Sequence, residues 1–329
     1  MIASQEMDQP ISYRSYESGD ENAIIELFNL VFRKDLKIGQ WNWAYNENPI
    51  KRMDIILALS DRKLVGHSAS TPLEFHCQGN CVQATRVQNV MVHPDYQGRG
   101  IFTETLKRLT EHFYSHNLDL VVTFPNNNSL PTFIKKLDYS HIDDIYTYHL
   151  PSSLMQNAGS RSLDVCIDQK IKFNDMDDTL IRSCLDCYEI YNRRAAEYLH
   201  WRFNERSNKK YFLLRAFEKN HEAALVIFKY YPEMRSVDIV ELFVEGSGNN
   251  IPSLLLKIKN FYENSGMLVD SFNIWSMPHY TCYDAIIDAG FEKTQFCTHM
   301  VTKSFSSKTV NGYNKPVSYY LSMSDSDVY

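Results

Sequence analysis

The sequence lacks the features that place a chain in a membrane, on a secretory route or on nucleic acid. No apolar run approaches the roughly 18 residues that a membrane-spanning helix needs. The N-terminus has no basic region followed by an apolar stretch, so a secretory signal is not expected. The formal net charge is −6, and no Lys/Arg block offers an electrostatic footprint for nucleic acid. We therefore expect a cytoplasmic protein with no membrane span and no nucleic-acid partner.

Motifs for metal ions and for common nucleotide-binding loops are also missing. The seven cysteines are odd in number and scattered, as expected of reduced thiols. Cys184 and Cys187 form a C-x-x-C pair that has no second pair and no paired histidines, so no metal site is expected. The sequence contains no Gly-Lys-Ser/Thr, which a Walker A loop requires.

The residue pattern predicts the same alternation of strands and helices in each half of the chain. In the first half we predict strands at 11–17, 54–59, 64–73, 82–92, 118–124 and 145–150, and helices at 21–33, 41–45, 101–117 and 129–137. In the second half we predict strands at 165–173, 211–216, 223–230, 237–244, 272–275 and 296–302, and helices at 177–191, 195–205, 251–264 and 280–289. This mixture indicates an α/β fold.

One stretch repeats in residues as well as in pattern. Trp43-Ala-Tyr-Asn-Glu in the first half is matched by Trp201-Arg-Phe-Asn-Glu in the second, at the same helix-to-strand junction. We interpret this match as a duplication, although each Trp also suits a plain core anchor. The expected domains are 1–155 and 156–305, with a small polar linker at 156–162 and a C-terminal tail at 306–329.

The stretch with the clearest chemical signal follows the strand that ends near Val92. Pro94 ends this strand because it cannot donate a ladder hydrogen bond. Gly98 and Gly100 then flank Arg99, and a helix begins at once. Free N–H groups at such a helix start favour a pyrophosphate, and Arg99 can add a charge-assisted contact. Taken alone, a G-x-G before a helix is most often an ordinary turn, and Thr103 stands where a Rossmann fingerprint needs its third glycine.

The run V-x-P-x-Y-Q-G-R-G-I-F over residues 92–102 resembles the acyl-CoA-binding signature Q/R-x-x-G-x-G/A of the GNAT acetyltransferase superfamily. Gln97 and Gly100 occupy its first two fixed positions, and Phe102 stands where a small residue is usual. The order of strands and helices over residues 11–150 is also that of this family. The resemblance therefore implies two tandem GNAT-like domains, each an α+β unit with a mixed sheet.

The same resemblance implies a single acyl-CoA site, in the first domain. The residues that would contact acyl-CoA are Met91, Val92, Gln97, Gly98, Arg99, Gly100, Ile101, Phe102 and Ser129. Loop amides would hold the pyrophosphate, the strand around 90–92 would pair with the pantetheine arm, and the strand at 118–124 would splay away. The run F-P-N-N-N-S over 124–129 resembles a segment of one family branch, which places Asn126 beside CoA, while Ser129 serves equally well as a helix cap. The second-half loop at 244–250 lacks the signature spacing.

The expected catalytic groups are Gln88, Asn89 and Asn126. Many relatives carry a tyrosine acid in a Y-x-K-x-G-F pattern, but Ile134 stands in its place here, so that acid cannot be carried over. The strand at 82–92 has no carboxylate. On it, Gln88 and Asn89 can orient an amine or a bridging water. The preceding strand offers possible bases in His67, Glu74 and His76, each also an ordinary strand residue. Because burial lowers the pKa of an amine, the leading mechanism has no dedicated base.

The tandem arrangement with W-x-[YF]-N-E in both halves resembles bacterial N-acyltransferases for surface polysaccharide synthesis. Those enzymes act on nucleotide-linked amino deoxysugars, with dTDP the expected nucleotide. Aromatic residues such as Trp41, Trp43 and Tyr45 could then stack on the acceptor, and Arg202 could meet its pyrophosphate; a buried Trp anchor and a surface Arg explain these residues equally well. Two alternatives stay open. One is a GNAT enzyme acting on an antibiotic, polyamine or peptide amine, and the other is a catalytically silent acyl-CoA-binding protein.

Overall fold

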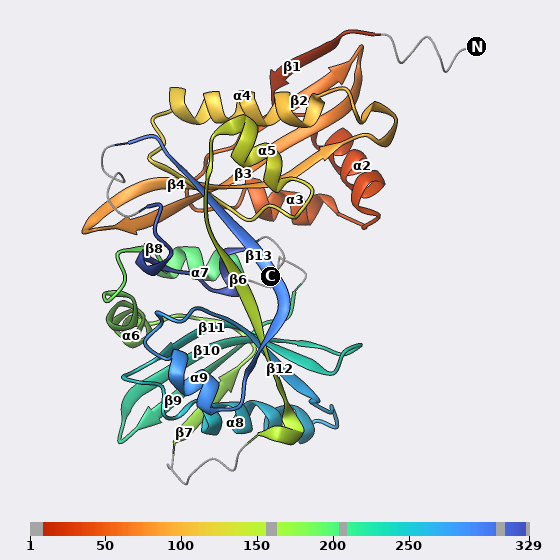
Figure 1. Ribbon diagram of the computed structural model, residues 1–329. Helices are drawn as coiled ribbons and strands as arrows, with labels where there is room; N and C mark the ends of the chain where they lie inside the picture. Colours follow the sequence, from red (N-terminus) through yellow and green to blue (C-terminus); the bar gives the residue numbers. More distant parts are fainter. Residues whose placement is uncertain (1–8, 156–162, 204–208, 307–312, 327–329) are drawn as a thin grey trace. The chain divides into compact units, whose positions relative to one another are not determined.

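The computed structural model describes residues 9–155, 163–203, 209–306 and 313–326 (Figure 1). By their contacts the residues form two compact units, one of Met1–Ile142 with His299–Asn314 and one of Asp143–Thr298 with Lys315–Tyr329. No helix within the described ranges is long and apolar enough to cross a membrane.

This division differs from the expected boundaries after residues 155 and 305. The chain passes from one unit to the other inside two continuous strands, β6 (Ser140–Pro151) and β13 (Glu292–Ser304). The expected C-terminal tail at 306–329 is divided between the units, because its residues up to Asn314 group with the first unit and those from Lys315 group with the second. The expected linker at 156–162 lies outside the described residues.

The first unit is built on a mixed sheet in the order β1-β2-β3-β4-β5, followed by the end of β13. The strands and helices are β1 (Ile11–Ser15), α2 (Glu21–Phe32), α3 (Ile38–Tyr45), β2 (Asp54–Ser60), β3 (Lys63–Cys77), β4 (Asn80–Val92), α4 (Ile101–Ser115), β5 (Leu120–Thr123) and α5 (Leu130–Leu137). Neighbouring strands are antiparallel except β4 and β5, which are parallel.

Alternation along β3 assigns the helices to the two faces of this sheet. Ser68 faces α4, since its hydroxyl donates to Thr105 Oγ1 at 2.7 Å. Gly66 faces the same way, because a Cβ there would lie 2.5 Å from Ile101 Cγ2. His67 and Ala69 therefore face the opposite side, where Ala69 packs in a buried cluster with residues of α2 and α3. Figure 1 shows α4 on one side of these strands and α3 on the other.

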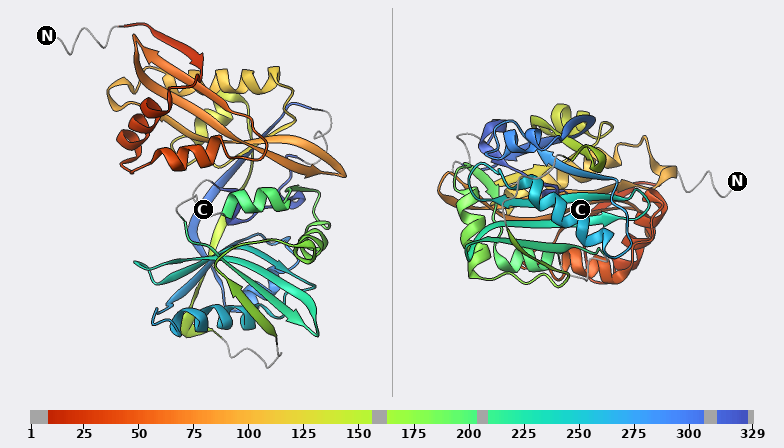
Figure 2. Two further views of the ribbon diagram at one scale, coloured as in Figure 1. Left: turned by 180° about the vertical axis from the view of Figure 1, so that it is seen from behind. Right: turned by 90° about the horizontal axis from the view of Figure 1, so that it is seen from below.

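The second unit has a sheet in the order β6-β12-β11-β10-β9-β7. Its further elements are β7 (Asp164–Asp168), α6 (Asp175–Leu185), β8 (Ile190–Asn192), α7 (Ala196–Phe203), β9 (Phe212–Glu218), β10 (His221–Tyr231), β11 (Ser236–Val244), α8 (Ile251–Glu263), β12 (Ser271–Ser276), α9 (Tyr283–Asp288) and β14 (Tyr319–Tyr320). As in the first unit, one neighbouring pair, β11 and β12, is parallel, so this sheet is also mixed. Figure 2 shows the chain from two further sides. The helix expected at 177–191 ends earlier, at Leu185, and its last residues form β8.

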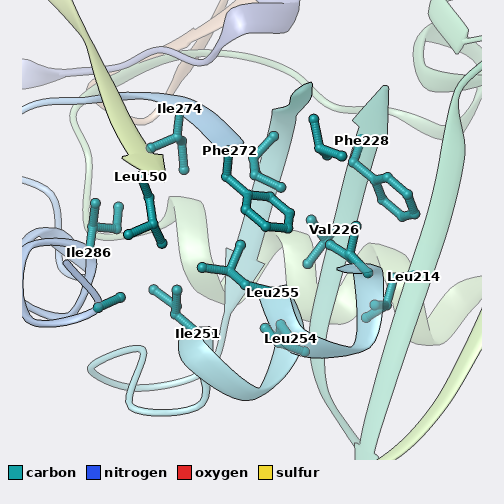
Figure 3. Packing of buried hydrophobic residues seen from close by; sticks show 14 of the residues in the cluster. Leu150, Leu214, Val226, Phe228, Ile251, Leu254, Leu255, Phe272, Ile274 and Ile286 are labelled. Atoms are coloured by element: carbon teal, nitrogen blue, oxygen red, sulfur yellow. The ribbon is translucent and has the colours of Figure 1, made fainter. Parts of the chain in front are cut away.

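The core of the second unit lies between one face of its sheet and the helices α8 and α9 (Figure 3). The strands contribute alternate residues, and α8 contributes residues at helical spacing. The labelled members are Leu150, Leu214, Val226, Phe228, Ile251, Leu254, Leu255, Phe272, Ile274 and Ile286.

A buried ionic cluster fixes the last described residues inside the second unit. The Arg194 side chain is 0% exposed, with Nε 3.0 Å from Glu241 Oε1 and Nη2 2.7 Å from Asp325 Oδ2. Asn192 Nδ2 adds a bond to Asp325 Oδ1 at 3.2 Å. Burial raises the pKa of Glu241, and the positive charge of Arg194 offsets part of that rise. The cluster thus joins β11, the stretch before α7 and the end of the chain.

We predict that Arg194→Met lowers the free energy of unfolding by about 3–5 kcal/mol, because it leaves two buried carboxylates without their counter-charge. The matched control is Arg182→Met, at a side chain that is 69% exposed and pairs with Asp178 on the same helix. That change should cost less than about 1 kcal/mol. Urea denaturation of both variants checks the prediction, and equal losses would contradict it.

Candidate functional site

The loop that the sequence singled out connects the end of β4 to the start of α4. After Val92 the chain forms a short 3-10 turn, Pro94–Tyr96. Gly98 and Gly100 then adopt φ of +80° and +78°, the left-handed region that glycine tolerates best. A Cβ added to either glycine would meet no described atom within 4 Å. The dihedral angles therefore favour glycine at both positions, and the loop backbone is open to a ligand.

The start of α4 offers backbone donors to such a ligand. Glu104 N donates to Gly100 O at 3.0 Å, which is where hydrogen bonding along this helix begins. The preceding N–H groups of the first turn have no acceptor within the helix, and the helix dipole favours an anion beside them. Glu104, the acidic residue of this turn, pairs with Arg108 at 2.8 Å.

Side chains of the loop hold it on the sheet. Ile101 is buried and packs in the space left by Gly66, and Phe102 packs against the neighbouring buried clusters. Arg99 lies over the Tyr96 ring at 5.3 Å, and its Nη2 donates to the Gln9 carbonyl at 3.0 Å. The guanidinium thus stays next to the loop, where a phosphate contact was expected.

A β-bulge interrupts β4 just before the loop. Gln88 pairs with Ala69, whereas Met91 pairs with His67, so two residues of β4 oppose one residue of β3. The first of these, Asn89, has a left-handed φ of +52°. Its carbonyl accepts a hydrogen bond from His67 Nδ1 at 2.7 Å. Because a bulge takes its extra residue out of the ladder, the backbone of β4 is free of regular pairing at this point.

The parallel pairing of β4 with β5 is short. It joins Ala84 to Leu120 and Thr85 to Val121. Further along, the Thr123 hydroxyl donates to the Val87 carbonyl at 2.8 Å, so a side chain makes the connection there. This change from ladder to side-chain bonding occurs where the sequence analysis expected the strands to splay.

The three expected catalytic residues are all engaged with the protein itself. Gln88 is buried, and its Oε1 accepts from Arg86 Nη2 at 3.0 Å. Asn89 Nδ2 donates to the Tyr45 hydroxyl at 2.9 Å. Asn126 Oδ1 accepts from the Asn128 and Ser129 amides at 3.1 and 3.0 Å and from the Ser129 hydroxyl at 3.1 Å. Asn126 therefore stabilises the turn into α5, and its contact with CoA stays a prediction, as does that of Ser129.

Of the two expected acceptor residues, one is in the wrong environment. Arg202 is 2% exposed, and its Nε and Nη2 donate to the carbonyls of Ser324 and Ser326 at 3.1 and 3.0 Å. This burial contradicts the expected place of Arg202 against an acceptor pyrophosphate, because its guanidinium binds the end of the chain instead. Trp43 is half-buried on α3 and stays a candidate.

The possible base His67 and Tyr139, the tyrosine that follows α5, are not exposed. His67 is 0% exposed, and burial lowers its pKa to about 4. Tyr139 is buried against Phe133 with its hydroxyl 3.3 Å from Thr110 Oγ1, and burial raises its pKa. Trp41 and Tyr45, two of the aromatic residues expected to be able to stack on an acceptor, are 0% and 3% exposed. The bond between Tyr45 and Asn89 was not predicted, although Tyr45 belongs to the duplicated W-x-[YF]-N-E segment. The signal was the difference between Tyr45 and its counterpart Phe203, since a hydroxyl is present in one copy alone.

The corresponding loop of the second unit, between β11 and α8, is closed by packing. Gly248 also has a positive φ, but a Cβ there would lie 3.1 Å from Cys282 Cβ and 3.2 Å from Ala285 Cβ. Pro252 in the first turn of α8 removes one backbone donor. These two features agree with a single acyl-CoA site per chain.

Residues 12–142 match the family model described as the acetyltransferase (GNAT) domain. A comparison with curated proteins finds no match. A probable N-acyltransferase of Enterococcus faecalis V583 is similar in structure, with 12% identity, a TM-score of 0.73 and coverage of 93% of this chain and 75% of that one. A tandem GNAT protein from the clavulanic acid biosynthesis pathway has 12% identity, a TM-score of 0.62 and coverage of 90% and 99%.

A third similar structure, Saccharomyces cerevisiae N-myristoyltransferase with bound myristoyl-CoA, has 11% identity, a TM-score of 0.59 and coverage of 90% and 85%. At these identities the structures establish the fold, so the expected mixed α/β GNAT fold is confirmed. The match of residues 12–142 to the acetyltransferase domain model agrees with the expected enzyme class, an acyl-CoA-dependent N-acyltransferase.

We predict that Gly100→Asp weakens CoA binding at least tenfold, or by about 1.4 kcal/mol, because it places a negative charge beside the phosphates. Gly100→Ala is the control, since it carries the same unfavourable dihedral without the charge and should lose less. Calorimetry should also give one CoA per wild-type chain. A stoichiometry of two, or the same affinity in the Asp variant as in the wild type, would contradict the single-site assignment.

We also predict an acid-dependent loss of stability from His67. Its pKa is about 4 in the folded chain and about 6.5 in the unfolded chain, which therefore takes up the proton first as the pH falls. The stability contributed by the neutral imidazole is present above about pH 6.5 and is lost toward about pH 4. Between about pH 7.5 and pH 5, the wild type should lose about 2 kcal/mol more than His67→Gln, which cannot titrate. Denaturation at the two pH values measures this difference, and equal losses would refute it.

Proposed function

We propose that this chain is an N-acyltransferase that moves an acyl group from acyl-CoA to an amine. The observation that carries the proposal is the loop at 97–102, which presents open backbone and free first-turn amides directly after the β4 bulge. This loop lies within the segment that matches the GNAT domain model. The order of bulge, turn and helix start suits a long ligand with a pyrophosphate at one end and a reactive carbonyl at the other.

Acyl-CoA would supply an activated acyl group as its thioester. The amides of 97–102 would hold the pyrophosphate, and Met91 and Val92 would offer their backbone to the pantetheine arm. The amine nitrogen would form a bond to the acyl carbon while the carbon–sulfur bond breaks, the amine loses a proton and CoA leaves as the thiol. The unit would position both reactants, and burial of the amine would favour its neutral, nucleophilic form.

We further propose that the acceptor is a nucleotide-linked amino deoxysugar, with dTDP as the nucleotide. Two features support this choice. The first is the duplicated W-x-[YF]-N-E segment, and the second is a second unit whose own loop is closed. A duplicated unit that binds no cofactor would be available to bind the acceptor. In this proposal Trp43 stacks on the acceptor, and Arg202 is no longer assigned a contact with the acceptor pyrophosphate.

A thiol-release assay of several acyl-CoAs against a panel of amines tests both levels of the proposal. We expect nucleotide-linked amino sugars to exceed free amino sugars, aminoglycosides, polyamines and peptide amines by at least about tenfold in kcat/KM. Similar rates for the free amines would remove the acceptor assignment and leave the N-acyltransferase. CoA binding without thiol release on any amine would favour a silent acyl-CoA-binding protein.

A further inference from the structure

We propose that Tyr45 and His67 are positioning residues that fix the bulge of β4 and thereby orient the carbonyl of a bound acyl-CoA. The inference rests on the proposed function and goes beyond it. It names residues that act through Asn89 and do not touch the reacting atoms. Both lie outside the acyl-CoA signature at 92–102.

Asn89 is held from two directions. On the main chain, His67 Nδ1 donates to its carbonyl at 2.7 Å. On the side chain, its Nδ2 donates to the Tyr45 hydroxyl at 2.9 Å. A left-handed φ at a residue other than glycine is unfavourable and persists where surrounding contacts determine it. The two hydrogen bonds are such contacts, since one fixes the peptide plane and the other fixes the side chain.

The partners of Asn89 are themselves immobilised by burial. His67 is fully buried within the sheet, between β2 and β4. Because its Nδ1 donates to a carbonyl, the proton of the neutral imidazole lies on Nδ1. The Tyr45 ring packs on Trp41 at a centroid distance of 5.3 Å, and Trp41 is fully buried. Neither side chain can rotate without disturbing the core under α2 and α3, so both act as fixed supports.

The second unit provides a natural comparison. Phe203 stands where Tyr45 stands in the duplicated segment, so this copy has no hydroxyl. Phe203 is buried and packs edge-on against Tyr211 at 5.0 Å. The first unit, whose loop is open, therefore has this hydroxyl. The second unit, whose loop is closed by Cys282 and Ala285, lacks it. A role in core packing alone would be served equally by either ring.

A support for the bulge should affect the acyl end of the ligand and leave the pyrophosphate end unchanged. The test therefore compares CoA with the ketone analogue of acetyl-CoA in which a methylene follows the sulfur. This analogue keeps a carbonyl and cannot transfer its acyl group. Calorimetry on the full-length chain gives both affinities, and no acceptor amine is needed.

We expect Tyr45→Phe to weaken binding of the ketone analogue by about threefold to tenfold and to change CoA affinity by less than about twofold. Tyr139→Phe is the matched control, because it removes a buried hydroxyl of the same unit away from the bulge, and it should change neither affinity. His67→Gln keeps a donor and should retain more analogue affinity than His67→Leu. Once an accepted amine is known, the Tyr45 variant should lower kcat and leave the acceptor KM unchanged.

The possible failures are distinguishable. If folded Tyr45→Phe weakens both ligands equally, or neither, the positioning role is wrong and the N-acyltransferase proposal stands. Equal binding of CoA and the analogue by the wild type would also overturn the inference, because the carbonyl would then make no contact. If the wild type binds neither ligand, the proposed function itself fails. Should His67→Leu not fold, the Tyr45→Phe result decides alone.

Discussion

The absence of a side chain at Gly66 determines how closely the first turn of α4, and with it the loop, can approach β3. A Cβ there would stand 2.5 Å from Ile101 Cγ2, so the first turn of α4 can approach β3 this closely only against glycine. Two residues on, the Ser68 hydroxyl donates a hydrogen bond to Thr105 on the next turn of the helix. These two contacts fix where the free amides of α4 point. Phe102, at the position where the signature that this loop resembles usually has a small residue, packs against two buried clusters.

Much of the fold could be predicted because its signals are local. The helix expected at 101–117 is observed at 101–115, with Leu106, Leu109 and Phe113 buried at helical spacing. The helix expected at 177–191 failed at its end for a non-local reason. Residues 190–192 form a strand because they pair with residues 319 and 320 from the end of the chain, and no local pattern reveals such a partner.

The candidate site also has one part that the local sequence predicts and one part that it does not. The loop at 97–102 was recognised because its glycines and helix start are contiguous in the sequence. The left-handed Asn89 and its bonds to Tyr45 and His67 depend on residues brought together by the sheet and by α3, so no local pattern predicts them. The sign that the sequence did contain was the hydroxyl of Tyr45, which its counterpart Phe203 lacks. Arg202 was misplaced because a charged side chain suggests the surface, whereas the carbonyls that bury it belong to a segment more than a hundred residues later.

The passage of β13 from the second unit into the first has a consequence for folding during synthesis of the chain. β5 in the first unit pairs with residues 301–304, which leave the ribosome long after the rest of that sheet. Until then β5 presents an unpaired edge, the kind of surface that recruits strands from other chains. The nascent first half therefore carries this risk from the time that β5 forms until residues 301–304 are made. Its dependence on chaperones should follow the speed at which the final strand is delivered.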